Sequence, residues 1–255
     1  MSEYIYPTIS NQTAISILKE KIDNLQPYAF TRFGDGEIYI LNKKSYPSFE
    51  HRACNEWGYQ YPSEVNQFYN DAYVIIQHAL KNSDLIGIMN QTCSIVNLNY
   101  SPSIWSIKKQ LLIEWGIDIN SMQICDHMLC RSAEFGSINS MKYILNGKSV
   151  NIISTNTKLL KQKKLSDKLN TDVTFTQHDK NINLNNRLEF IKAFKNIKSD
   201  VVLLGVGIQK DYGVILRDEY GKIAIDMGAT LDAWAGIISR PWFNPGNLQD
   251  HLVIK

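Results

Sequence analysis

Long apolar runs are missing from this 255-residue sequence, and no stretch approaches the roughly 18 apolar residues of a transmembrane helix. The N-terminal residues also lack the basic and apolar regions of a secretory signal peptide. Charge of one sign is scarce as well, because 27 Lys and Arg residues face 25 Asp and Glu residues. Nucleic-acid binding usually needs a larger basic excess, since it depends on neutralising phosphates. We therefore expect a cytoplasmic protein with no nucleic-acid partner.

Cysteine is also rare, and the four cysteines, Cys54, Cys93, Cys125 and Cys130, form no CxxC pair. Cys125 and Cys130 flank His127, but their spacing fits no standard zinc pattern. A chain of this length can bury a sizeable core without cross-links. We interpret the cysteines as buried free thiols.

Helix-period segments alternate with short apolar runs along the whole chain. The apolar runs predict strands at 28–32, 85–89, 122–125, 150–153, 173–175, 201–206 and 223–225. Helices are expected at 11–25, 65–79, 102–114, 133–145, 155–168, 182–196 and 209–219. Parallel neighbours need crossover connections, so this alternation predicts an α/β fold with a Rossmann-like, mostly parallel sheet and helices on both faces. No linker divides the chain, and we expect one domain over residues 1–255.

The end of the first predicted strand carries the strongest candidate site, Arg32-Phe-Gly34-Asp35-Gly36-Glu37. Two carboxylates one residue apart suit Mg²⁺ or Mn²⁺, which prefer oxygen ligands and share them with substrate phosphates. Gly34 and Gly36 would permit positive φ and close approach of a ligand. Arg32 would contact a phosphate or hold a carboxylate. The alternative is a surface turn in which Asp35 caps a helix from Gly36 and Glu37 is solvated.

The segment FTRFGDGEIYIL (30–41) resembles the signature of the GT-D glycosyltransferases, a Rossmann-like class with an Asp-X-Glu metal motif. SDVVLLGVGIQKDYGVILRDEYGKIAIDMGATLDAW (199–234) and CRSAEFGSINSMKYILNGKSVNIIS (130–154) are similar to the family's C-terminal and middle segments. The resemblance implies that Asp35 and Glu37 are catalytic and hold Mn²⁺ or Mg²⁺ on a nucleotide-sugar diphosphate. Many members have Asp-X-Gly-His where this chain has Asp226-Met-Gly-Ala229, so any role of that histidine is absent or moved.

Further candidates for substrate binding follow other predicted strands: Arg131, Thr155, Asn156, Gly205, Gly207, Asp226 and Asp232. The two glycines would let a diphosphate approach a helix N-terminus, or would serve only in packing. The threonine and asparagine would contact the nucleotide or cap a helix. Either aspartate would orient a ribose hydroxyl or act as a general base, and the alternative for Asp232 is a surface acid. The arginine would pair with a diphosphate or with a protein carboxylate.

Together these features predict a metal-dependent glycosyltransferase that moves a sugar from a nucleotide-sugar, expected to be UDP-linked, to a glycan, lipid-linked or protein acceptor in bacterial surface glycosylation. The alternatives are another Rossmann-like, metal-dependent nucleotide enzyme, such as a phosphohydrolase or other transferase, and a non-catalytic binding protein. Aromatic residues in 43–62, with Trp234, Trp242 and Phe243, are expected to be exposed. They would form an acceptor surface with transient membrane contact, or a homo-oligomer interface; the alternative is that they are ordinary core residues.

Overall fold

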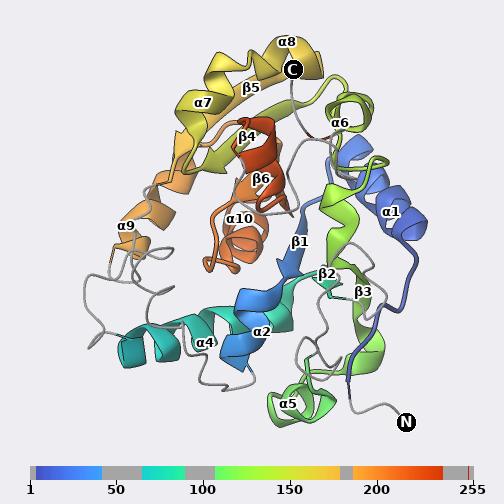
Figure 1. The fold of residues 1–255 in the computed structure, drawn as a ribbon, viewed down its shortest axis with the longest axis vertical. Helices are drawn as coiled ribbons and strands as arrows, with labels where there is room; N and C mark the ends of the chain where they lie inside the picture. Colours follow the sequence, from blue (N-terminus) through green and yellow to red (C-terminus); the bar gives the residue numbers. More distant parts are fainter. Residues whose placement is uncertain (1–3, 42–64, 90–106, 179–185, 238–251, 253–255) are drawn as a thin grey trace.

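The computed structural model describes residues 4–41, 65–89, 107–178, 186–237 and 252. In this part of the chain seven strands form one sheet in the order β3-β2-β1-β7-β6-β4-β5, and every pair is parallel (Figure 1). The strands are β1 (Tyr28–Phe33), β2 (Leu85–Ile88), β3 (Gln123–Asp126), β4 (Ser149–Ser154), β5 (Asp172–Gln177), β6 (Val201–Gly205) and β7 (Ile223–Asp226). All seven predicted strands and the α/β fold class are confirmed.

The central strands are buried along their whole length, which explains their continuous apolar sequences. All residues of β1 and β7 are buried, as are all of β6 except Gly205. Parallel sheets covered on both faces need apolar side chains in both directions. The register pairs Phe30 with Ile225 and Leu204 with Asp226. It thereby brings the carboxyl ends of β1, β7 and β6 to one edge of the sheet.

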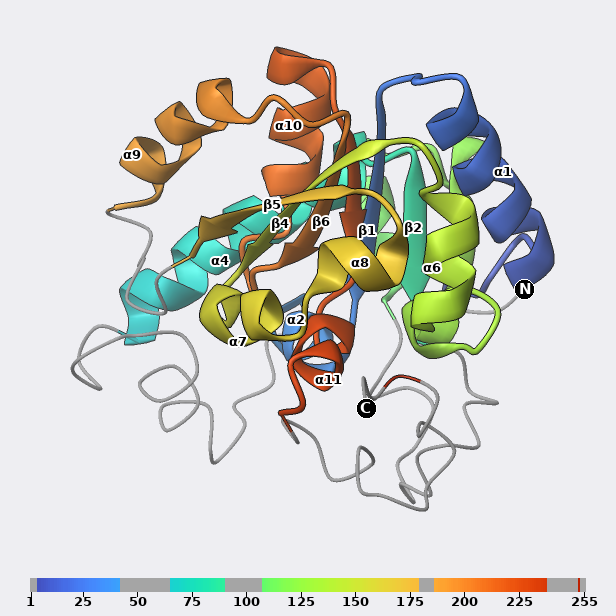
Figure 2. The same ribbon diagram turned by 90° about the horizontal axis from the view of Figure 1, so that it is seen from above.

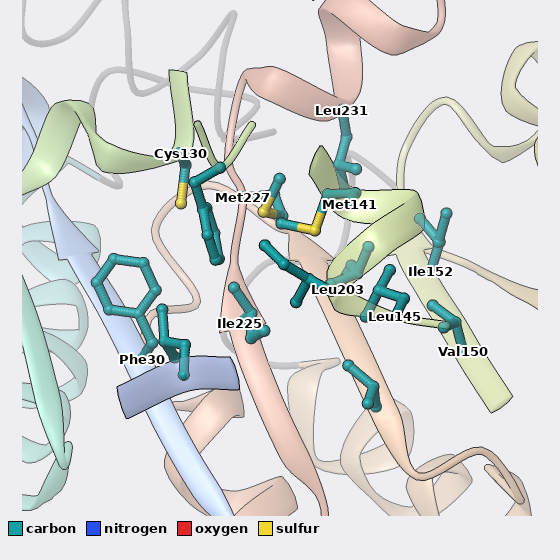
Figure 3. Packing of buried hydrophobic residues seen from close by; sticks show 14 of the residues in the cluster. Phe30, Cys130, Met141, Leu145, Val150, Ile152, Leu203, Ile225, Met227 and Leu231 are labelled. Atoms are coloured by element: carbon teal, nitrogen blue, oxygen red, sulfur yellow. The ribbon is translucent and has the colours of Figure 1, made fainter. Parts of the chain in front are cut away.

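One face of the sheet is covered by α1 (Asn11–Asp23), α6 (Ile138–Ile144), α7 (Thr157–Gln162), α8 (Leu165–Leu169) and α11 (Thr230–Trp234). Ser10 caps α1, its Oγ accepting from the Thr13 backbone N–H at 3.1 Å. Figure 3 shows how Met141 of α6 packs beside Leu203 of β6 and Met227 in the core of this face.

The other face carries α2 (Asp35–Leu41), α4 (Val65–Asn82), α5 (Lys109–Glu114), α9 (Arg187–Lys192) and α10 (Tyr212–Tyr220). Short 3₁₀ turns complete the described elements: η3 (Ile119–Ser121), η4 (His127–Arg131) and η5 (Ala193–Asn196). Figure 2 shows α10 and α4 across the strands from α1, α6 and α8. Within the described residues no helix is long and apolar enough to cross a bilayer.

Two expectations about local structure differ from what the fold shows. The helix expected at 155–168 is divided into α7 and α8, because Lys164 between them has a left-handed φ of 49°. Trp234, expected to be exposed, is fully buried in the core, and its indole Nε1 donates to the Gly136 carbonyl at 3.0 Å. Residues 43–62, Trp242 and Phe243 lie outside the described residues.

The cysteine prediction is confirmed where it can be compared. Cys125 and Cys130 are buried free thiols, and burial raises the pKa of Cys130 to about 12. Such thiols are protonated and unreactive at neutral pH. Cys54 and Cys93 lie outside the described residues.

Candidate active site

The chain leaves neighbouring strands toward opposite faces at several places in the sheet, and two of these places carry most of the predicted site residues. After β1 it passes to α2 and after β7 to α11; after β4 it passes to α7 and after β6 to α10. In open α/β sheets ligands bind outside the carboxyl ends of strands at such switch points. The residues at these two places are therefore the ones to consider as a site.

Four charged side chains are buried together at the first switch point. Arg32, Glu37, Lys210 and Asp226 are 5%, 9%, 8% and 5% exposed, respectively. They come from the end of β1, from α2, from the loop after β6 and from the end of β7. Because isolated buried charges are costly, such groups are expected to be paired.

Lys210 joins the two carboxylates of this cluster. Its Nζ lies 2.8 Å from Asp226 Oδ2 and 3.5 Å from Glu37 Oε1. Burial alone would lower the pKa of Lys210, but the carboxylates of Asp226 and Glu37 outweigh it and raise that pKa above its usual value. Lys210 is therefore a fixed positive charge between α2 and β7.

Arg32 is held against the end of β7. Its backbone N–H donates to Asp226 Oδ2 at 3.2 Å, and its Nη1 donates to the Met227 carbonyl at 3.3 Å. Nε of Arg32 is buried and has no hydrogen-bond partner among the described residues. A buried donor without a partner needs an explanation, and a bound ligand or an ordered water is one.

Gly228 is required for this arrangement. Its φ is +51°, and a Cβ at this position would lie 2.8 Å from Arg32 Nη2. Both the left-handed backbone and the close approach of the guanidinium favour glycine. The third residue of the Asp226-Met-Gly-Ala229 motif thus makes room for Arg32.

Glu37 is buried and serves as a helix cap. Its Oε2 accepts from the Gly34 backbone N–H at 2.8 Å, which is one half of a capping box at the start of α2; the other half is absent because Gly34 has no side chain. The alternative in which Asp35 precedes the helix and Glu37 is solvated is therefore wrong, because α2 begins at Asp35 itself. The side chain of Asp35 lies outside the described part of the structure.

The expected positive φ angles at Gly34 and Gly36 are not present. Gly36 lies in the first turn of α2, and neither residue has a left-handed backbone. A Cβ at Gly34 would meet Glu37 Oε2 at 3.5 Å, an ordinary contact. The turn after β1 is therefore made by immediate helix formation rather than by glycine flexibility.

At the second switch point Asn156 and Asp232 are brought together. Asn156 Nδ2 donates to Asp232 Oδ1 at 2.7 Å, which ties the loop after β4 to α11. Asn156 precedes α7, but its side chain makes no capping hydrogen bond, so the capping interpretation is wrong for this residue. Its backbone N–H instead donates to Ser154 Oγ at 3.1 Å. Thr155 beside it is half-buried.

The two glycines after β6 have different surroundings. A Cβ at Gly205 would lie 3.0 Å from Leu231 Cδ1, so this residue is needed for packing of α11. Gly207 is exposed and has a φ of +59°. Only Gly207 is therefore both accessible and conformationally suited to a close ligand approach.

The turn η4 brings three further polar residues to the end of β3. Asp126 Oδ1 accepts from the Met128 backbone N–H at 2.9 Å and lies 3.3 Å from His127 Nδ1. Burial lowers the pKa of His127 to about 4, so the ring is neutral at pH 7. Arg131, a predicted site residue, is buried, with Nη1 lying 3.7 Å from Met128 Sδ.

Sequence reasoning did not assign Lys210 to the site. The one signal for Lys210 in the sequence was its position shortly after Gly205 and Gly207 at the end of a predicted strand. The sequence cannot show that Glu37 and Asp226 both lie close to this lysine. Among the described residues no three His, Cys, Asp or Glu side chains form a ready metal cage. Glu37 nevertheless suits a hard cation, because its Oε1 makes only the long contact with Lys210.

A hollow of about 570 Å³ lies at the opposite, amino end of the strands, where Tyr28, Asp84 and Gln123 are among its lining residues. None of the predicted site residues lines it. Its walls carry both charge signs, and Asp84 is already bound to Arg217 at 2.6 Å. It has no connection with the cluster at the carboxyl ends.

Comparison with known proteins places this chain in a family. The model of the GT-D fold-like domain matches residues 9–234, and the chain belongs to that family. No curated protein matches the sequence.

Three solved structures are similar to this chain. One, described as the highly conserved domain of unknown function 1792 with a distinct glycosyltransferase fold, is 16% identical, with a TM-score of 0.57 over 96% of this chain and 87% of the other. A selenomethionine-substituted structure of that domain is 14% identical, with a TM-score of 0.55 over 96% and 87%. A structure described as a new glycosyltransferase (DUF1792) from Streptococcus sanguinis is 13% identical, with a TM-score of 0.54 over 90% and 84%. At these identities the likeness shows the fold alone.

Proposed function

We propose that this protein is a metal-dependent glycosyltransferase that moves a sugar from a nucleotide-sugar, UDP-linked, to a hydroxyl of a glycan, lipid-linked or protein acceptor. The observation that carries the proposal is the buried cluster of Arg32, Glu37, Lys210 and Asp226 at a switch point of a GT-D family sheet. The unpartnered Nε of Arg32 supports an anionic ligand there.

The chemistry of sugar transfer makes specific demands on such a site. The leaving nucleoside diphosphate gains negative charge, which nearby cations stabilise. Arg32 and Lys210 are the fixed cations of the cluster. Asp35 and Glu37 would hold Mn²⁺ or Mg²⁺, which would supply further positive charge to the diphosphate.

The remaining candidates divide into anchors and ligand contacts. Asp226 is occupied by Lys210 and by the Arg32 backbone, so we assign it to holding these two residues rather than to a general base. Asp232 and Asn156, with Thr155, are assigned to the nucleoside, and Gly207 to the diphosphate. The proposal includes a cytoplasmic enzyme of bacterial surface glycosylation that meets its acceptor transiently at the membrane surface, as a monomer or homo-oligomer.

The test is a thermal-stabilisation screen of UDP-, GDP-, dTDP- and CMP-sugars, with and without Mn²⁺, followed by assay of the released nucleotide, which is a nucleoside diphosphate for the first three donors and CMP for the last. We expect one nucleotide-sugar to stabilise the protein more with Mn²⁺, and to be turned over. Asp35→Asn and Glu37→Gln should each remove most of this turnover while the protein stays folded. Release of inorganic phosphate would instead indicate a phosphohydrolase, and stabilisation without turnover a binding protein.

A further inference from the structure

The charged cluster at the ends of β1 and β7 is neutral within the described residues. Arg32 and Lys210 contribute two positive charges, and Glu37 and Asp226 contribute two negative charges. A free divalent cation is attracted by uncompensated negative charge, and these four side chains by themselves offer it none. The carboxylates of Glu37 and Asp226 are therefore already paired with the ammonium group of Lys210.

Lys210 holds its two carboxylates unequally. The contact with Asp226 Oδ2 is 2.8 Å and is a hydrogen bond, whereas the contact with Glu37 Oε1 is 3.5 Å. Asp226 is also held by the Arg32 backbone N–H at 3.2 Å, so it is the more firmly fixed partner. A lysine side chain has a flexible stem and rotatable donors, so its ammonium can leave Glu37 while it keeps Asp226.

We propose that Lys210 acts as a resident cation that keeps divalent metal from Glu37 until a nucleoside diphosphate binds. This inference rests on the proposed function and adds an order of binding to it. The diphosphate supplies the negative charge that the cluster lacks, and it offers Lys210 a partner in place of Glu37. Metal and nucleotide then bind cooperatively, each raising the affinity for the other by the same factor.

The size of this coupling follows from the charge. At an effective dielectric constant of about 20, Coulomb's law gives several powers of ten in metal affinity for one unit charge about 5 Å from a divalent ion. Screening by solvent and salt reduces this effect, and we expect a change of at least about tenfold. Removing the ammonium should therefore strengthen metal binding in the absence of nucleotide. A gain in metal affinity is unusual for a substitution in an active site, and removal of a lysine with only a structural role would not produce this gain.

The experiment measures Mn²⁺ binding directly, from the electron paramagnetic resonance signal of free Mn²⁺. Wild type, Lys210→Gln and Lys210→Arg are titrated with Mn²⁺ alone, and with UDP, GDP or dTDP in parallel samples. Lys192→Gln is the matched control, because it removes one lysine charge from a side chain that is 68% exposed. Mixtures of Mn²⁺ and each nucleotide without protein give the background.

We expect wild type to bind Mn²⁺ at least about tenfold more tightly with its nucleotide than without it. Lys210→Gln should bind Mn²⁺ alone about tenfold more tightly than wild type, while Lys210→Arg and Lys192→Gln should match wild type. If Lys210→Gln does not fold, Lys210→Met, which also removes the charge, is titrated in its place. Equal wild-type affinity with and without nucleotide would overturn the inference, as would unchanged affinity in folded Lys210→Gln. If wild type bound no nucleotide in any sample, the proposed function itself would fail.

Discussion

The buried imidazole of His127 should make the stability of this protein depend on pH in a defined window. Its side chain is 6% exposed, and burial, the largest cause, acts with the positive charges of Arg131 and Arg32 to lower its pKa from 6.5 to about 4. The nearby carboxylate of Asp126 opposes this shift but does not cancel it. Between these two pKa values His127 is protonated in the unfolded chain and neutral in the folded chain.

The sign and size of the effect follow from proton linkage. Because the unfolded state binds more protons, the free energy of unfolding falls as the pH falls from about 6.5 to about 4, and this contribution is constant below the window. A difference of about 2.5 pKa units corresponds to a loss on the order of 3 kcal/mol. Carboxylates elsewhere in the protein titrate in part of the same range, so the histidine must be isolated by a variant.

The assay is urea denaturation of wild type and His127→Asn at several pH values from about 7 to about 4. Asparagine is chosen because its amide can face Asp126 as Nδ1 does. We expect wild type to lose on the order of 3 kcal/mol more stability than His127→Asn across this window. Parallel profiles for the two proteins would refute the reasoning, because His127 would then have a normal pKa. A steeper loss in the variant would mean that His127 is protonated and bound to Asp126.

Three further predictions concern the edges of the site. Gly228→Ala should lower the free energy of unfolding by about 1–3 kcal/mol, because its left-handed backbone and the Arg32 guanidinium exclude a side chain, and urea denaturation would measure it. Trp234→Phe should lower the free energy of unfolding by about 1–3 kcal/mol, because it leaves the Gly136 carbonyl without its hydrogen bond. Elution on a sizing column should not change, and a shift to monomer would show that Trp234 lies at a subunit interface. Asn156→Asp should place a second carboxylate against Asp232 and lower nucleotide-dependent stabilisation in the thermal screen, and an unchanged thermal shift would remove this pair from the nucleoside site.

The strands of the sheet could be predicted from the sequence because buried strands consist largely of apolar and β-branched residues. The run 201–206 is apolar on both sides, as a central parallel strand must be, whereas β5 at the edge of the sheet alternates apolar and polar residues. The helix α2 was foreseen only within the rejected alternative, because the Asp-Gly pair after β1 resembles a turn. Helix formation at Asp35 depends on the Glu37 cap and on packing against α4, which local sequence does not reveal.

The site was only partly predictable for a related reason. Asp226 and Arg32 were identified from their places at strand ends, but their pairing and the role of Lys210 depend on strand order and register. Trp234 was misread because an apolar segment that is expected to be a loop gives no sign of the direction in which a short helix packs. In the fold, α11 turns this side chain into the core beside α6.

The first and last strands of the sheet are neighbours, and this has a consequence for biosynthesis. β1 leaves the ribosome early, but one of its two edges stays open until β7 is made, and the bond from Arg32 to Asp226 spans 194 residues. Contacts this distant in sequence carry a large loop-closure cost and form slowly. The hydrogen bond from Arg32 to Asp226 and the ion pair of Lys210 with Asp226 therefore form only after β7 has been made. The charged cluster is consequently completed late in synthesis, after the other six strands of the described sheet have been made.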